Sequence, residues 1–300
     1  MTARKSSATM SSSAKTKHTP HTKTFALALG GGGARGLAHI AVLEALDDLG
    51  LKPVAIAGTS IGAAIGAAYA AGMSGKALRR YVTTLAHDRP DVWARLMRTR
   101  GAALSQMFTT GFGNPMVLDA DKFGAAFLPP DLPESFADLG IPLQVIAADL
   151  YGREEVLFAE GPLRPAIAAS MAVPGLLRPV EMEGRILVDG GAVNPLPFDR
   201  LRGMADIVVA VDASVGPVAP RGVPDPWETL FSTLQVMGHT IVTAKLKDHA
   251  PDLVLRPNVG VFRMLDFFQA SAILRAAEPI KAELRDKLGA LLGTGSSHTP

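Results

Sequence analysis

The stretch from Val54 to Ala63 constrains the fold most, because it places a serine on a tight turn between a strand and a helix. Apolar residues 54–57 predict a buried strand, and the small residues after Ser60 predict a helix. Between them lies a Gly-x-Ser-x-Gly motif, from Gly58 to Gly62. Glycines two residues before and after a serine allow a sharp turn without Cβ clashes. The motif therefore predicts a nucleophile elbow, with the Ser60 hydroxyl at the end of a sheet.

A second glycine-rich turn lies upstream, where an apolar strand pattern over 25–29 runs into Gly31-Gly32-Gly33-Ala34-Arg35-Gly36. A helix with a broad apolar stripe follows from Leu37. Gly33 and Ser60 are 27 residues apart, close to the roughly 30 residues of one βαβ unit. Parallel strands place both turns at the same edge of a sheet. We expect the N–H groups of Gly32, Gly33 and Ala34 to form an oxyanion hole, with Arg35 shaping the loop or adding positive potential.

The same loop also fits a dinucleotide-binding fingerprint, because Gly31, Gly33 and Gly36 have the spacing Gly-x-Gly-x-x-Gly. That fingerprint expects an acidic residue at the end of the second strand, about 20 residues further on. Here the second strand ends in Gly58-Thr59-Ser60. A dinucleotide-dependent oxidoreductase is therefore disfavoured but stays an alternative.

The proton acceptor for Ser60 has two candidates. Asp189 leaves a predicted strand into Gly190 and Gly191, a backbone suited to close approach, and an aspartate within hydrogen-bond reach can act directly on a serine hydroxyl. His249 has the late position that a histidine takes in a Ser-His-Asp α/β-hydrolase, although its charged surroundings also suit a solvated residue. An ordinary turn is the structural alternative for Asp-Gly-Gly.

Taken together, these motifs resemble those of the patatin-like phospholipase family. The resemblance is carried by Gly31–Gly36, Gly58–Gly62 and Asp189–Gly191, in that order, with supporting segments at 168–175 and 194–197. It covers about residues 25–212 and is strongest toward bacterial members. Gly30 departs from it, since bacterial members often have serine there; the three glycines and Arg35 still match.

The resemblance implies a three-layer α/β/α sandwich with a mostly parallel central sheet. It also implies a serine acyl hydrolase that cleaves lipid carboxylic esters (phospholipid, lysophospholipid or neutral lipid) without a metal or cofactor. Ser60 would be the nucleophile, Asp189 the proton acceptor in a Ser–Asp dyad without histidine, and residues 31–36 the oxyanion hole. Ser170 matches a family position near the site, where we expect a structural role. A non-catalytic binding member of the fold is a further alternative.

Composition and charge limit the other classes of function. The 300-residue chain has net charge +2 and no cysteine, which excludes disulfides and thiolate metal sites. Five basic residues fall within 1–23, and the rest of the chain has 25 basic and 28 acidic residues, with no basic footprint for nucleic acid. We predict a disordered basic tail (1–23), a catalytic core (24–214), a helical extension packed on the same domain (215–292) and a flexible tail (293–300).

Location is predicted from what the sequence lacks. The N-terminal tail has no apolar signal segment, and the longest apolar run, 61–73, is shorter than the about 20 residues that span a bilayer. We therefore expect a cytoplasmic protein; its lipid ester substrate is what the family resemblance implies. The segment 90–116 combines apolar residues and arginines, so it suits a lid, a lipid-contacting surface or a plain helical insertion. With the basic tail, it is the basis for expecting peripheral membrane contact.

Overall fold

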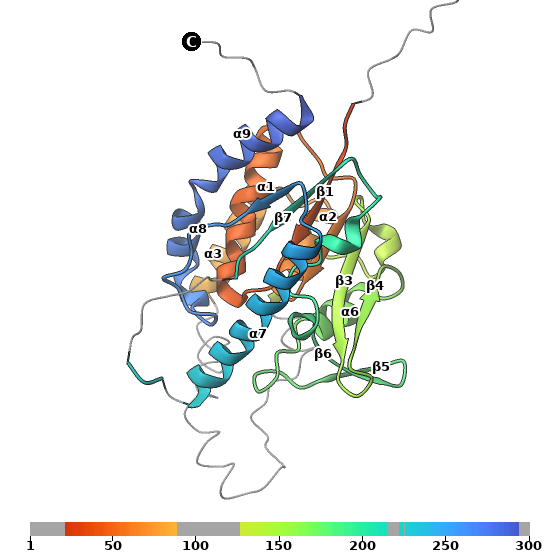
Figure 1. Cartoon of the computed structure of the whole chain (residues 1–300), viewed down its shortest axis with the longest axis vertical. Coiled ribbons are helices and arrows are strands. Elements are labelled where there is room, and N and C mark those ends of the chain that lie inside the picture. Colours follow the sequence, from red (N-terminus) through yellow and green to blue (C-terminus); the bar gives the residue numbers. More distant parts are fainter. Residues whose placement is uncertain (1–21, 89–126, 215–221, 225, 294–300) are drawn as a thin grey trace, which may run out of the picture.

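A single mixed β-sheet lies at the centre of the computed structural model, which describes residues 22–88, 127–214, 222–224 and 226–293 (Figure 1). Its strand order is β5-β6-β3-β2-β1-β7-β8, with β4 also paired to β3. The strands are β1 (Phe25–Leu29), β2 (Ile56–Thr59), β3 (Leu143–Asp149), β4 (Glu154–Phe158), β5 (Val180–Met182), β6 (Arg185–Asp189), β7 (Ile207–Val211) and β8 (Leu253–Leu255). Strands β3, β2, β1, β7 and β8 run parallel, so their carboxyl ends meet at one edge.

Helices cover both faces of this sheet. They are α1 (His39–Asp48), α2 (Ile61–Ala70), α3 (Gly75–Asp88), α6 (Leu163–Ser170), α7 (Pro226–Asp248), α8 (Ala270–Ala277) and α9 (Ile280–Leu292), with short 3-10 helices η1 (Gly33–Ala38), η2 (Phe136–Asp138), η3 (Gly190–Ala192), η4 (Phe198–Leu201) and η5 (Phe267–Gln269). Leu27 and Leu29 of β1 face the larger core, with α1, α2, α8 and α9. Ala26 and Ala28 face a smaller core with η4 and α7. The strand alternation thus builds three layers.

Strand β3 brings two other strands end to end. Its first half pairs in parallel with β2, up to Thr59 opposite Ile146, and its second half pairs antiparallel with β6, beginning with Asp189 opposite Ala147. Strand β4 pairs with β3 from Val145 to Asp149, and so occupies one side of β3 next to both of these pairings. Strands β2 and β6 therefore share the other side of β3. They run toward each other along that side. Their last residues therefore meet, and so do Ser60 and Asp189.

The three-layer α/β/α sandwich with a mostly parallel central sheet is confirmed. The elbow strand was predicted at 54–57 but lies at Ile56–Thr59. The strand begins later than predicted because Val54 is exposed and lies outside the sheet. The predicted extension 215–292 contains β8, which extends the sheet beside β7. The 90–116 segment and nearly all of the basic tail fall outside the described residues. Within the described part of the chain, no helix is long and apolar enough to cross a membrane.

Candidate active site

Ser60 occupies a strained turn between β2 and α2. Its backbone has φ 56° and ψ −125°, a conformation that costs a non-glycine residue about 1–3 kcal/mol. Gly62 lets α2 approach the sheet, because a Cβ there would lie 2.2 Å from the carbonyl oxygen of Leu29. The turn is also anchored to β3: the Ser60 N–H donates to Ser170 Oγ at 2.8 Å, and Ser170 Oγ donates to the Ile146 carbonyl at 2.5 Å. Ser170 thus holds the elbow in place.

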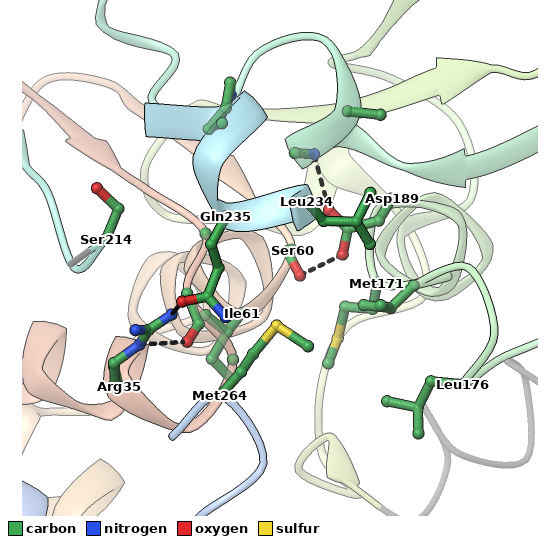
Figure 2. Close-up of a pocket in the computed structure, with 18 of the residues that line it drawn as sticks. Arg35, Ser60, Ile61, Met171, Leu176, Asp189, Ser214, Leu234, Gln235 and Met264 are labelled. Carbon is green, nitrogen blue, oxygen red and sulfur yellow. Dashed lines mark hydrogen bonds between the residues drawn. The ribbon is translucent and has the colours of Figure 1, made fainter. Parts of the chain in front are cut away.

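Ser60 and Asp189 are in direct contact. Ser60 Oγ donates to Asp189 Oδ2 at 2.5 Å, and the N–H of Gly191 donates to Asp189 Oδ1 at 2.7 Å (Figure 2). Both side chains are nearly enclosed, with exposed fractions of 7% for Ser60 and 9% for Asp189. Burial raises the pKa of Asp189 to about 6, against the opposing effect of the bonds from Ser60 and Gly191. The carboxylate is therefore a stronger base than a solvated aspartate and is ionised at neutral pH.

The glycine loop brings free N–H groups to the same place. Gly31 donates its N–H to the Pro195 carbonyl at 2.9 Å, and Ala34 donates to the Met264 carbonyl at 2.7 Å. Within the described part of the chain, the N–H groups of Gly32 and Gly33 have no protein acceptor. Of the predicted oxyanion donors Gly32, Gly33 and Ala34, only the first two therefore remain, because the Ala34 N–H already donates to Met264.

Gly33 must be glycine for a reason of space as well as conformation. Its φ is 59°, and a Cβ there would lie 2.3 Å from the Met264 carbonyl oxygen. The loop therefore lies directly against the segment that precedes η5. Both Gly32 and Gly33 line the cavity that contains Ser60.

Arg35 is a buried cation beside this loop. Its side chain is 3% exposed, donates to Gln235 Oε1 at 2.9 Å, and approaches the Gly32 carbonyl at 3.4 Å (Figure 2). Burial lowers the pKa of Arg35 to about 10, while Asp212 and Asp266 act in the opposite direction from a distance. It stays charged at neutral pH. The predicted roles of shaping the loop and adding positive potential are both compatible with these contacts.

A cavity of about 170 Å³ opens over Ser60, and most of its wall is apolar. One side comes from the segment after α6, with Met171, Val173, Leu176 and Leu177, and another from Met264, Leu265 and Phe267. Helix α7 covers it with Leu234, Gln235, Met237, Gly238 and His239; Figure 2 shows Gln235 extending from this helix toward Arg35. An acyl chain fits such a wall better than a polar substrate.

Three histidines of the described residues, His39, His239 and His249, occupy different environments. His39 is buried, its Nε2 bonds the Gly30 carbonyl at 2.8 Å, and burial lowers its pKa to about 4. His249, the candidate base of a Ser-His-Asp triad, follows α7, bonds Asp248 and is not among the residues that line the cavity. His239 lines the cavity, but its ring has no bond to Ser60 or Asp189 among those that the described residues form. The geometry thus pairs Ser60 with Asp189.

Much of the cavity wall was not predicted from the sequence. Gln235 and Met264 lie 175 and 204 residues beyond Ser60, in segments without a recognisable motif. The predicted helical extension 215–292 includes α7, but the position of this helix over the site depends on the path of the chain. No group of three or more histidine, aspartate or glutamate side chains arranged to bind a metal occurs among the described residues.

The sequence matches a family model described as patatin-like phospholipase over residues 27–202, which is more than half of the chain. The chain belongs to the patatin-like phospholipase family. The match contains the glycine loop, the elbow and Asp189, whereas the family model does not reach α7.

Among curated proteins, the chain is 37% identical over 202 residues to an uncharacterised NTE family protein of Mycobacterium tuberculosis, covering 67% of this chain and 52% of that protein. It is 32% identical over 192 residues to patatin-like phospholipase domain-containing protein 6 of Homo sapiens, covering 63% of this chain and 13% of that protein. The chain thus spans about half the length of its mycobacterial relatives. The solved structure of human GIVD cytosolic phospholipase A2 is similar over 91% of this chain and 60% of that one, at 13% identity and TM-score 0.46. Likeness at that level does not bear on the reaction.

Proposed function

We propose that this chain is a lipid acyl hydrolase that cleaves carboxylic esters of phospholipids, lysophospholipids or neutral lipids through a Ser60–Asp189 dyad. The observation that carries the proposal is the 2.5 Å bond from Ser60 Oγ to Asp189 Oδ2, in an apolar cavity beside the N–H groups of Gly32 and Gly33, which have no acceptor among the described residues. Nucleophile, base, oxyanion donors and acyl site are thereby within one cavity, as acyl transfer requires. Membership of the family supports the same reaction class.

The first half of the reaction acylates Ser60. Asp189 accepts the hydroxyl proton as Ser60 Oγ attacks the ester carbonyl carbon, and the carbonyl oxygen becomes an oxyanion bound by the Gly32 and Gly33 N–H groups. The nearby charge of Arg35 and the N-terminal end of α2 favour that negative charge. When the tetrahedral intermediate collapses, the C–O bond to the alcohol breaks. The alcohol or lysolipid leaves with the proton from Asp189, and the acyl group stays on Ser60.

The second half returns the enzyme to its starting state. A water molecule takes the place of the alcohol, and Asp189 accepts one of its protons as the water oxygen attacks the acyl carbon. The second tetrahedral intermediate expels Ser60 Oγ, which recovers its proton from Asp189. The fatty acid is released. A pKa raised to about 6 suits Asp189 to both directions of proton transfer.

We also propose contact with a membrane surface through the outer face of α7. From 229 to 244 the helix has no Lys, Arg, Asp or Glu, although most of that stretch is exposed. Val236 is 65% exposed and Met237 54%, and Met237 also lines the cavity. The hydroxyls of Thr233 and Thr240 donate to their own helix, to the carbonyls of Thr229 and Val236, so they do not need water. This uncharged face is continuous with the cavity that would take a lipid.

The test of the dyad uses purified variants and a soluble short acyl ester. Ser60→Ala should lose esterase activity while keeping the wild-type circular dichroism spectrum, and a fluorophosphonate probe should label the wild type only. Asp189→Asn should lower kcat by about a hundredfold to ten-thousandfold, because the serine loses its base. Ester hydrolysis by folded Ser60→Ala at the wild-type rate would refute the assignment.

The Ser-His-Asp alternative is tested with the same assay. His249→Ala should keep wild-type activity, since His249 is not part of the cavity wall. An inactive His249→Ala beside an active Asp189→Asn would favour a triad. Tight binding of NAD or a flavin by calorimetry, together with an absence of esterase activity, would favour the dinucleotide alternative.

A further inference from the structure

Two consecutive residues, Asn194 and Pro195, contact all three segments that carry the proposed chemistry. The Asn194 carbonyl accepts the hydroxyl hydrogen of Thr59 at 2.8 Å, and the Asn194 N–H donates to the Gly190 carbonyl at 2.8 Å. The Pro195 carbonyl accepts the N–H of Gly31 at 2.9 Å. Thr59 directly precedes Ser60, Gly190 directly follows Asp189, and Gly31 begins the oxyanion loop. The backbone of these two consecutive residues therefore connects the elbow, the base and the oxyanion loop.

The side chain of Asn194 is itself held by charged residues. Lys245 Nζ donates to Asn194 Oδ1 at 2.6 Å and also to Asp199. The Asn194 amide donates to Glu155 Oε2 at 3.0 Å and to Asp199 Oδ1 at 3.2 Å. Asn194 is 1% exposed, so every polar atom of its side chain must find a protein partner. The partners fix its orientation: the lysine can only donate, and the carboxylates can only accept.

Lys245 therefore connects α7, through Asn194, to the segments on either side of the dyad. It lies in the last turns of α7, outside the residues that match the family model, and its ammonium group also stacks over the Phe198 ring at 5.2 Å. It does not line the cavity, and neither do Thr59 and Asn194. None of the three can contact substrate there. Their contacts instead decide where Ser60, Asp189 and Gly31 lie relative to one another.

We propose that the Asn194–Pro195 backbone is a clamp that fixes the spacing of nucleophile, base and oxyanion loop, and that Lys245 is a positioning residue that holds this clamp through the Asn194 side chain. The inference rests on the proposed function. A shift of about 1 Å in the reacting groups can cost about a hundredfold in rate. Loss of either contact should therefore lower kcat and leave KM nearly unchanged.

The first experiment compares Lys245→Met with Lys247→Met, the same change on an exposed lysine of the same helix. A fluorophosphonate probe counts the competent Ser60 residues in each preparation, and kcat on a soluble ester is divided by that count. We expect kcat per labelled serine to fall about tenfold to a hundredfold in Lys245→Met, with KM within about twofold. Lys247→Met should match the wild type. A purely stabilising role for Lys245 would lower the thermal midpoint without changing kcat per labelled serine, and that result would overturn its positioning role.

The second experiment tests the clamp without disturbing the charged cluster. Thr59→Val removes only the hydroxyl bonded to Asn194, whereas Thr59→Ser keeps it. We expect a fall of about tenfold or more in kcat per labelled serine for Thr59→Val, and most of kcat retained in Thr59→Ser. Equal kcat in the two variants would overturn the clamp. Failure of the probe to label wild-type enzyme would instead count against the proposed function, so the two failures are distinguishable.

Discussion

At the scale of single residues, the ionisation of Asp189 should set the pH dependence of the reaction. Burial raises its pKa to about 6, and only the ionised form can accept the Ser60 proton. We therefore expect kcat/KM on a soluble ester to be level above about pH 7 and to fall about tenfold per pH unit well below pH 6. The measurement is a pH profile between 4.5 and 8.5 at constant ionic strength.

The control for that profile is His239→Gln. His239 lines the same cavity, so this substitution tests whether a side chain other than Asp189 sets the profile. The acidic limb of the profile should stay where it is in the variant. A limb that disappears with His239 would assign the titrating group to that histidine and not to Asp189.

The same raised pKa predicts that the carboxylate of Asp189 destabilises the fold. A group with a folded-state pKa of about 6, against an ordinary 3.8, favours the folded state when protonated and loses that contribution as pH rises through 6. A shift of about 2 units corresponds to about 3 kcal/mol. Asp189→Asn removes the charge but keeps the shape, so we expect it to be inactive yet more stable than wild type at pH 8, by up to about 3 kcal/mol in urea unfolding.

The pH series is the control for this prediction. The advantage of Asp189→Asn should shrink as pH falls from 6 toward 4, where the wild-type residue is also neutral. Buried His39 acts with the opposite sign: its lowered pKa stabilises the fold above pH 6.5, and that contribution is lost as pH falls toward 4. Both proteins contain His39, so their difference isolates Asp189. An advantage independent of pH would contradict the electrostatic explanation.

At the scale of elements, the uncharged outer face of α7 should determine how the protein acts on lipid aggregates. Val236→Glu places a charge on that face and removes a valine whose burial would contribute about 1.5 kcal/mol or more, equivalent to about tenfold in binding. We expect the ratio of activity on phosphatidylcholine vesicles to activity on a soluble ester to fall about tenfold. Vesicle flotation should show a parallel loss of binding.

Leu150→Glu is the matched control, because Leu150 is an exposed apolar residue between β3 and β4 and far from α7 in the sequence. Its activity ratio should equal that of the wild type. If both variants lower the ratio equally, general charge repulsion explains the effect. If neither variant lowers the ratio, the α7 face does not contact the membrane. Either another protein chain or only solvent then covers this face.

The elements also explain how far the sequence could predict the site. Strands β1, β2 and β7 are short apolar runs, and the first two end directly in glycine turns, so both the strands and the turns could be predicted locally. The meeting of Ser60 with Asp189 could not, because it requires β2 and β6 to lie end to end along β3. The motif resemblance paired these residues without supplying that geometry. Gln235 and Lys245 had no signal at all, since their partners are fixed only by the path of α7.

At the scale of the whole molecule, the segment 215–292 should fold as one unit with the motif-bearing core. Leu284 and Leu288 of α9 are fully buried in the larger core, where they share one cluster with Leu43 of α1 and Leu29 of β1. We expect Leu284→Ala to lower the free energy of unfolding by about 2–5 kcal/mol. Arg285→Ala, one residue further along the same helix and exposed, should change it by less than about 0.5 kcal/mol.

The shape of the unfolding curve decides whether one unit or two unfold. Ser60 is far from α9 in the sequence, yet β1, which leads into the oxyanion loop, belongs to the same core as α1 and α9. Loss of α9 packing should therefore destabilise the site together with the core. Thermal unfolding of Leu284→Ala, followed by circular dichroism and by fluorophosphonate labelling of Ser60, should give one transition at one lowered midpoint. Labelling that survives a first unfolding transition would show that the C-terminal helices form a separate unit. The catalytic core would then end near residue 214.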